Sequence, residues 1–372
     1  MKEMDYLSGS VLGKNFVIST WGESHGPALG VVIDGCPAGI PISIEDIQKD
    51  LDRRKPGQSI YSSPRKEQDK VEILSGVFDG KTTGTPISMI IFNTNQRSQD
   101  YSQIKEVYRP GHADLVYDIK YGFRDYRGGG RSSGRETVAR VAAGAVAKKI
   151  LNHLGINVLA YTLSIGDIEI DKERFDIDEI FRNPFAMPDA EAAKAAAQFL
   201  QQIKKEGDSA GGVVECIIKG MPAGVGEPVF EKLDAALAKA IFSIGAVKGV
   251  EFGSGFKSSH MKGSDNNDNY KMDEEGKIKK LSNNSGGIVG GISEGEPIVF
   301  RAAFKPTPSI SIPQKTVSKQ GENAKIVVKG RHDPIIVPRA VVVVEAMAAI
   351  TIVDYLFQSI LSRIDIIKKA LE

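Results

Sequence analysis

The sequence predicts an α+β fold, because strand-like and helix-like segments are mixed without the regular strand–helix–strand rhythm of a parallel sheet. Three observations support this prediction. Residues 31–40 and 213–225 are each typical of a strand that ends in a turn rich in glycine and proline. Residues 71–78 and 85–92 alternate as a hairpin does. Long helical segments, the first at residues 135–153, follow these strands.

The elements are expected in the following order. The first strand ends at the turn 34–39, and Ser43 then caps a helix over 44–53, because its hydroxyl can accept a hydrogen bond from a free backbone N–H. The hairpin follows, with turn signals at Asp79-Gly80 and Thr83-Gly84. Two more helices are predicted, over 135–153 and 191–205, and the many alanines of the first indicate close helix packing.

The second half of the chain resembles the first in one respect. The strand at 213–218 also meets a Gly-x-Pro-Ala-Gly turn, and a helix is predicted over 229–242. Gly35 and Gly220 lie 185 residues apart, about half the chain. This spacing hints at an internal duplication, although Pro-Ala-Gly is common turn chemistry and one shared pentapeptide can be a coincidence.

Length, charge and composition narrow the classes of function. We expect one domain over residues 1–372, with mobile surface loops near 262–287 and 305–325, which are rich in polar residues, glycine and proline. Lysine and arginine total 48 against 47 acidic residues, which argues against a nucleic-acid binder. The chain has only two cysteines and no pair of histidines at a metal-binding spacing, which argues against a metal site.

The location of the protein is expected to be cytoplasmic. Residues 1–5 do not begin a hydrophobic stretch, so no signal peptide is predicted. The most apolar stretch, 340–353, is short and is interrupted by Glu345, so we interpret it as a buried helix rather than a membrane span.

A glycine-rich and arginine-rich segment is the strongest candidate for a binding site. Three glycines (128–130) and two serines (132–133) precede a predicted helix, an arrangement in which backbone N–H groups favour an anion. Arginines at 124, 127, 131 and 135 add forked donors that suit phosphate and carboxylate. A solvated loop and an RGG-like RNA-binding patch are the alternatives, but the balanced charge of the chain argues against RNA binding.

Two histidines stand in unusual surroundings. His25 lies in the segment Gly22-Glu23-Ser24-His25-Gly26, and His112 lies in Arg109-Pro110-Gly111-His112-Ala113-Asp114. Each is beside a glycine, which lets a ligand approach the backbone closely. Taken singly, each is also consistent with an ordinary hydrogen-bonded imidazole. Composition and spacing therefore predict an anion-binding enzyme with two candidate acid–base histidines.

The same segments resemble the chorismate synthase family. The likeness runs in consistent order from about Gly9 to Asp354, and the motifs that carry it are Gly22 to Gly26, Arg109 to Asp114, Tyr121 to Ser133, Ser285 to Ser293, Lys305 to Ser309, and Lys329 to Pro334. Several long motifs in order are far more specific than any single one.

The resemblance implies a fold and a reaction. The implied fold is a β–α–β sandwich, in which two sheets enclose a helical layer, assembled as a homotetramer. The implied reaction is the anti 1,4-elimination of phosphate from 5-enolpyruvylshikimate 3-phosphate to give chorismate, which is redox-neutral but needs reduced FMN. No extra domain for flavin reduction by NADPH is recognisable, so an external flavin reductase is the expected partner. A phosphate-ester lyase or transferase without flavin is the alternative enzyme.

The resemblance also implies roles for individual residues. His25 would protonate the departing phosphate, His112 would hold or transfer a proton beside the flavin, and Asp333 would lie near the reactive flavin nitrogen. The implied hydroxyl relays are Ser24 and Ser133. The implied substrate ligands are Arg54, Arg109, Arg135 and Arg331. The implied flavin contacts are Arg131, Ser132, Ser133, Gly245, Ala246, Gly290, Lys305, Pro306, Thr307, Pro308, Ser309 and Arg331.

This chain departs from the family pattern at one position. Family members usually carry a second basic residue after the Arg-Arg-x-Pro-Gly run, where this chain has Ile60. The corresponding contact is therefore missing, or Lys55 or Arg65 supplies it.

Overall fold

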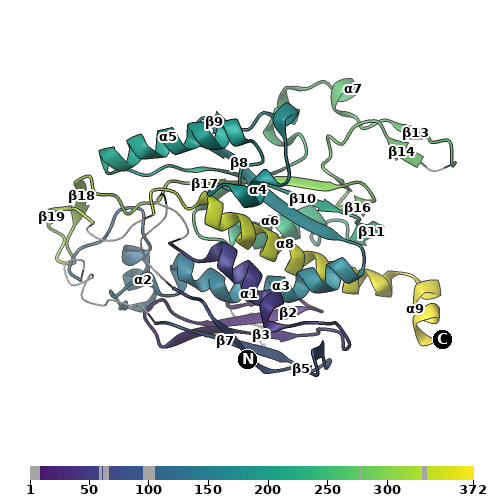
Figure 1. Cartoon of the computed structure of the whole chain (residues 1–372), viewed down its shortest axis with the longest axis horizontal. Coiled ribbons are helices and arrows are strands. Elements are labelled where there is room, and N and C mark those ends of the chain that lie inside the picture. The colour runs from purple at the N-terminus through teal and green to yellow at the C-terminus, as the bar shows by residue number, and fades with distance from the viewer. Residues whose placement is uncertain (1–8, 58–60, 62–66, 95–104, 277, 329–332) are drawn as a thin grey trace.

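The computed structural model describes residues 9–57, 61, 67–94, 105–276, 278–328 and 333–372. Two antiparallel five-stranded sheets lie on either side of a layer of helices (Figure 1). The first sheet has the order β1-β2-β3-β7-β4, formed by Val11–Leu12, Val17–Gly22, Ala28–Asp34, Ile87–Phe92 and Val71–Ser75. The second has the order β12-β17-β10-β8-β9, formed by Val247–Phe252, Ile298–Phe304, Gly212–Lys219, Asn157–Ile165 and Ile168–Glu169. The predicted α+β class is confirmed.

The helical layer contains α1 (Ile44–Arg54), α3 (Thr137–His153), α6 (Leu233–Phe242) and α8 (Val337–Ser359). Helix α3 faces the first sheet and α8 faces the second, and the two helices pack on each other. They approach closely because small residues meet: a methyl group at Gly144 would lie 2.2 Å from Cβ of Ala346. Helix α1 has the predicted cap, in which the Ser43 hydroxyl and the Asp46 side chain bond each other's backbone N–H groups.

Helix α8 is the buried helix predicted over 340–353. In the described part of the chain it is the one helix, with its short extension to Ser362, that is long and apolar enough to cross a membrane, and 94% of its most apolar window is buried inside the protein. Glu345 in its middle is buried and accepts two hydrogen bonds from Arg53, at 2.6 and 2.9 Å. Burial alone would raise the pKa of Glu345, but Lys148 and Arg53 lower it to about 2, so this carboxylate stays ionised in the core.

The two halves of the chain share one topology. Strands β2, β3, β7 and β4 lie side by side in the first sheet, and β8, β10, β17 and β12 lie in the same order in the second. Of these four strands in each half, the first two along the chain precede a helix (α1 or α6), and the other two precede a long central helix (α3 or α8). Gly35 and Gly220 both end a strand with positive φ, 80° and 82°.

Four expectations need adjustment. Helix α6 begins at Leu233 rather than at Val229, whose φ of 65° is incompatible with a helix. The predicted hairpin is β4–β7, with a smaller hairpin at its end. Residues 262–287 contain helix α7 (Gly263–Asn266) and a hairpin of β13 (Tyr270–Met272) and β14 (Ile278–Lys280), so this segment is not irregular throughout. Residues 305–325 likewise contain β18 (Gln314–Val317) and the start of β19 (Asn323–Ile326). Their mobility stays a prediction.

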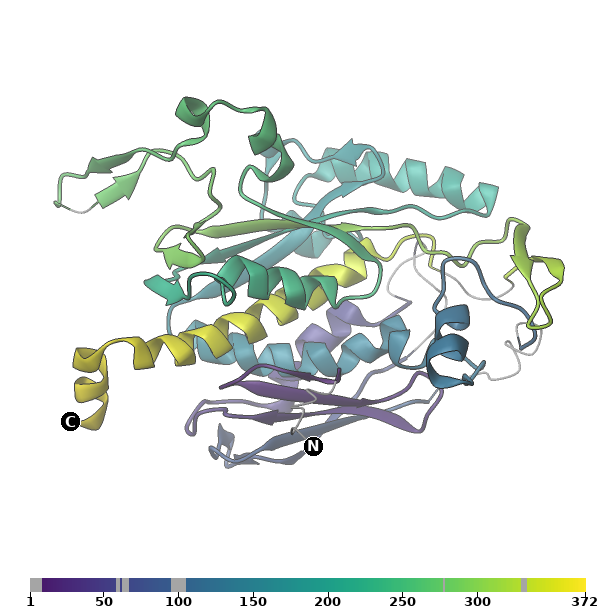
Figure 2. The ribbon, with the colours of Figure 1, turned by 180° about the vertical axis from the view of Figure 1, so that it is seen from behind.

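The remaining elements lie around these layers. Helix α5 (Ala190–Glu206) lies on the outer side of the second sheet (Figure 1). The β13–β14 hairpin and α9 project from the layered body (Figure 2). The other bounds are β5 Val77–Phe78, β6 Lys81–Thr82, β11 Ala223–Gly226, β13 Tyr270–Met272, β14 Ile278–Lys280, β15 Ile288–Val289, β16 Ile292–Glu294, β18 Gln314–Val317, β19 Asn323–Ile326, α2 Asp114–Tyr121, α4 Glu179–Arg182, α7 Gly263–Asn266 and α9 Ile364–Leu371.

Candidate active site

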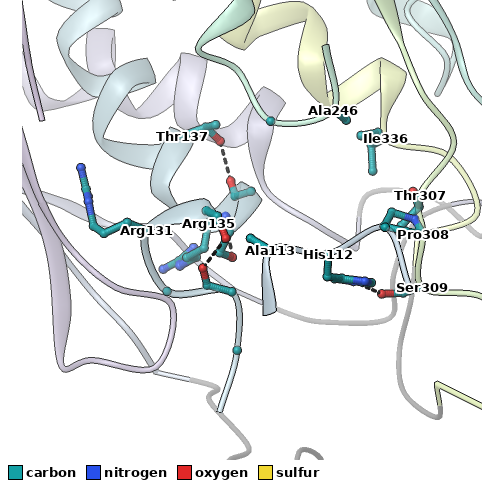
Figure 3. Close-up of a pocket in the computed structure, with 18 of the residues that line it drawn as sticks. His112, Ala113, Arg131, Arg135, Thr137, Ala246, Thr307, Pro308, Ser309 and Ile336 are labelled. Carbon is teal, nitrogen blue, oxygen red and sulfur yellow. Dashed lines mark hydrogen bonds between the residues drawn. The ribbon is translucent and has the colours of Figure 1, made fainter. Parts of the chain in front are cut away.

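A cavity of about 970 Å³ lies where several of the predicted motifs meet. Its walls come from residues 109, 111–114, 128–135, 244–246, 305 and 307–309, together with the first turns of α8 (Figure 3). Among the described lining residues there are seven arginines or lysines and five carboxylates. The cavity is therefore positively charged overall, although the chain as a whole is nearly neutral, and it suits an anionic ligand.

The glycine-rich segment leads into α3 through two short 3₁₀ turns. The hydroxyl of Ser133 caps the second of them by accepting a hydrogen bond from the backbone N–H of Arg135, at 3.2 Å. Arg131 lines the cavity, but it donates hydrogen bonds to the carbonyl oxygens of Thr20 and Gly22, each at 3.1 Å. In Figure 3 its side chain points away from His112. Arg131 thus ties the segment to strand β2.

Ser24 and His25 lie behind the cavity wall rather than on it. Neither lines the cavity, but Gly128 does, and a methyl group at Gly128 would lie 2.7 Å from both Ser24 Oγ and His25 Cδ2. The Ser24 hydroxyl is buried and has no hydrogen-bond partner among the described residues. The structure therefore brings the His25 motif and the glycine-rich motif into direct contact, with the Gly128 backbone between His25 and the cavity.

Two of the predicted substrate arginines converge on one carboxylate. Arg54 Nη2 lies 2.7 Å from Asp69 Oδ2, and Arg135 Nη1 forms a short ion pair with Asp69 Oδ1. Glu67 pairs with Arg135 as well, at 2.5 Å, and Asn93 Oδ1 accepts a hydrogen bond from Arg135 Nε at 3.0 Å. Burial alone would raise the pKa of Asp69, but Arg54 and Arg135 outweigh it and lower the pKa.

Arg109 and His112 are held within one loop. Arg109 makes a two-pronged bond with Asp114, with both distances 2.8 Å, and is buried. His112 Nδ1 lies 3.0 Å from the Pro110 carbonyl, which can only accept, so Nδ1 carries a hydrogen. Nε2 then accepts from the Ser309 hydroxyl at 2.9 Å, as Figure 3 shows. Burial, followed by the nearby Arg109, lowers the pKa of His112 to about 4, so the ring is neutral at pH 7.

The segment 305–309 closes another wall. The Lys305 backbone N–H donates to the Ala246 carbonyl at 2.9 Å, and Lys305 Nζ donates to the Gly111 carbonyl at 3.0 Å. Ala246 has a φ of 73°, a strained conformation for a residue with a side chain, and such strain is often found at binding sites. Thr307 Oγ1 is buried beside the cavity and has no hydrogen-bond partner among the described residues.

Of the remaining predicted site residues, some line the cavity and others do not. Ser132, Gly245, Pro308 and Asp333 line the cavity. Pro306 does not line it, and Gly290 lies in the turn between β15 and β16, away from this cavity. Arg331 and Ile60 lie outside the described residues. In the described part of the chain, no group of three histidine, cysteine or acidic side chains is arranged to hold a metal ion.

The sequence analysis missed Glu67, Asp69 and Arg339. Arg339 lines the cavity, donates to the Arg54 carbonyl at 2.9 Å and pairs with Asp333 at 2.6 Å. One signal could have revealed it. A cation in the first turn of a helix is unfavourable, because the N-terminal end of the helix dipole is positive, so an arginine in that turn needs another partner. Glu67 and Asp69 carry no comparable local signal.

Comparison with known proteins gives one consistent result. The family model described as chorismate synthase matches residues 16–357. A chorismate synthase of Lachnospira eligens is 62% identical over 98% of this chain and 99% of its own length. One from Methanosarcina mazei is 55% identical, covering 95% and 97%. A crystal structure of chorismate synthase superposes with a TM-score of 0.76 at 33% identity, covering 96% of each chain. With full-length similarity at this level, the chain belongs to the chorismate synthase family.

Proposed function

We infer that this protein catalyses the reaction of its family, the elimination of phosphate from 5-enolpyruvylshikimate 3-phosphate to give chorismate in the shikimate pathway. The observation that carries this inference is the positively charged cavity in which the family's motifs meet. The substrate bears one phosphate and two carboxylates, so several forked donors are needed to hold it.

The substrate ligands proposed are Arg54, Arg109, Arg135 and Arg331. The first three line the cavity and are already paired with carboxylates of the protein. A guanidinium has five N–H donors, so an arginine held by one or two carboxylates can still donate to a ligand. These carboxylates also reduce the freedom of the arginines before the substrate arrives, which lowers the entropic cost of binding.

The lining residues fit FMN. The buried Thr307 hydroxyl has no hydrogen-bond partner within the described residues, and apolar side chains of Ile244, Ile336 and Val343 offer a surface for a flat ring. The volume of about 970 Å³ is at the upper end of the range for a single ligand site, which leaves room beside the substrate. The proposed contacts are Ser132, Ser133, Gly245, Ala246, Lys305, Thr307, Pro308 and Ser309. Reduced FMN, when bound, supplies electron density transiently in a reaction that is redox-neutral overall.

The two histidines are proposed to act on different protons. His112 is neutral with its hydrogen on Nδ1, so Nε2 is the atom that can take up a proton on the cavity side. His25 is proposed to supply the proton of the departing phosphate. The Ser24 hydroxyl, for which the described part of the chain offers no hydrogen-bond partner, is proposed as a relay past Gly128. Ser133 is proposed as a second relay. The carboxylate of Asp333, oriented by Arg339, is proposed to lie near the reactive flavin nitrogen.

Several broader properties are also proposed from the family. These are a homotetrameric assembly, a cytoplasmic location and reduced FMN supplied by an external reductase rather than by the protein's own use of NADPH. We also propose that the layered arrangement is the family's β–α–β sandwich, and that the shared strand order of its two halves reflects an internal duplication.

An anaerobic assay tests the function directly. Purified protein, the substrate and dithionite-reduced FMN should form chorismate and release one phosphate for each chorismate. Oxidised FMN should support no turnover. Full turnover by flavin-stripped protein in aerobic buffer would instead favour a flavin-independent phosphate lyase.

A further inference from the structure

One carboxylate lies directly behind two arginines of the cavity. Arg54 comes from the end of α1 and Arg135 from the 3₁₀ turn just before α3, and both line the cavity. Asp69 does not line it, its side chain is 0% exposed, and it forms ion pairs with both guanidiniums. Asp69 therefore contacts both arginines from the side away from a ligand.

The position of Asp69 is itself well determined. Its φ of 49° lies in the left-handed region, which aspartate tolerates better than most residues. Gln48 on α1 donates to the Asp69 carbonyl at 3.3 Å and accepts from the Val71 N–H at 3.2 Å. The backbone of Asp69 is thus held between helix α1 and strand β4, which fixes the point from which its carboxylate reaches the two arginines.

Charge explains why these arginines need such a partner. Arg54 is 1% exposed, and a buried guanidinium is costly unless a carboxylate pairs with it. Two guanidiniums near each other also repel, and one shared carboxylate holds both in place. Glu67 differs from Asp69 in two ways. It lines the cavity, and among the described residues it pairs with Arg135 alone, whereas Asp69 pairs with both arginines.

We propose that Asp69 is a positioning residue that presents Arg54 and Arg135 together to the anionic groups of the substrate. This inference rests on the proposed function, because the substrate is taken to bind at these arginines. It assigns Asp69 no contact with the substrate or the reacting atoms. Loss of the carboxylate should therefore weaken substrate binding more than it slows the chemical step.

The test compares Asp69→Asn with a matched control. Asp69→Asn keeps the shape and removes the charge, so we expect KM to rise about 10- to 100-fold while kcat changes by less than about 3-fold. Asp189 is the control, since its side chain is 1% exposed and pairs with Arg174 at 2.8 Å, but it caps α5 and does not line the cavity. Asp189→Asn should lower the melting temperature and leave KM unchanged.

A second variant covers the case in which Asp69→Asn fails to fold. Asp69→Glu keeps the charge but displaces it by one methylene, so the protein should fold and KM should again rise. A wild-type KM in either folded variant would overturn the positioning role, as would an equal rise of KM in Asp189→Asn.

The proposed function can fail separately. If the wild-type protein forms no chorismate under the anaerobic conditions above, that function is wrong. The positioning role is then decided by calorimetry with inorganic phosphate, which should bind at least about 10-fold more weakly to Asp69→Asn than to the wild type. Equal affinities would overturn it.

Discussion

A methyl group added at Gly128 tests whether His25 acts from its place behind the cavity wall. The new Cβ would lie 2.7 Å from His25 Cδ2 and 3.2 Å from His25 Nε2, whereas ordinary contacts begin at 3.4 Å. The imidazole or the Gly128 backbone beside it must therefore move, so that their separation grows by about 0.7 Å or more. Because a misplacement near 1 Å can cost about 100-fold in rate, we expect Gly128→Ala to slow chorismate formation by about 10- to 100-fold in single turnover.

Gly134→Ala is the matched control for this experiment. Gly134 belongs to the same segment, and a methyl group there would meet no atom within 4 Å. Because Gly134 also lines the cavity, this variant should lose less rate than Gly128→Ala rather than none, and both variants should keep a melting temperature close to that of the wild type. A wild-type rate for Gly128→Ala would refute the reasoning, because His25 would then not act from this position. Equal losses in both variants would show that the segment needs glycine for its backbone instead.

Four further predictions concern single side chains. His25→Ala should lower kcat by about 10²–10⁴-fold, the usual contribution of a general acid, and leave flavin affinity unchanged. His112→Ala should instead alter the spectrum of the bound reduced flavin. If the two variants had the same kcat, flavin affinity and flavin spectrum, the separate roles of the two histidines would be refuted. The pKa of His112 is about 4 in the folded protein and near 6.5 in the unfolded chain. Between these pH values the unfolded chain binds the proton and the folded protein does not, so protonation favours unfolding. The free energy of unfolding, measured in urea, should fall as pH drops from 6.5 to 4, and His112→Gln should remove this component. Arg135→Ala should weaken substrate binding by roughly 2–4 kcal/mol, and an unchanged KM would contradict its role. Glu345→Gln should lower the free energy of unfolding in urea by up to about 3–5 kcal/mol, because it removes one of the two buried carboxylates, Glu345 and Asp50, that pair with Arg53 and Lys148, and it should leave KM unchanged.

Local patterns in the sequence predicted most of the elements. The Ser43 cap, the hairpin that became β4 and β7, and helices α3, α5 and α8 all follow from signals that lie within a few residues of each other. Such signals report on backbone hydrogen bonds and on the face that a segment buries, which are decided locally. The start of α6 was placed too early because nothing in the local pattern shows that Val229 takes a left-handed conformation.

The sequence also predicted the chemical character of the site. Three glycines, two serines and several arginines before a helix predict an anion site by composition alone. The motifs of the family then gave the candidate residues, and most of those within the described residues do line one cavity. The order of the motifs along the chain was enough to identify these residues, although it says nothing of the distances between them.

Only the tertiary structure decided which groups touch. Asp69 meets Arg135 across 66 positions of sequence, and Glu345 meets Arg53 across 292. No pattern in a single sequence encodes such a pairing, because each residue type is compatible with many partners until packing excludes the others. The same holds for His25, which lies behind Gly128 rather than on the cavity wall. The sequence by itself determined the elements and the residue types of the site. The packing of α1 and α3 against the first sheet brings distant segments close together. This close approach determined the partners and the charge states of the site residues.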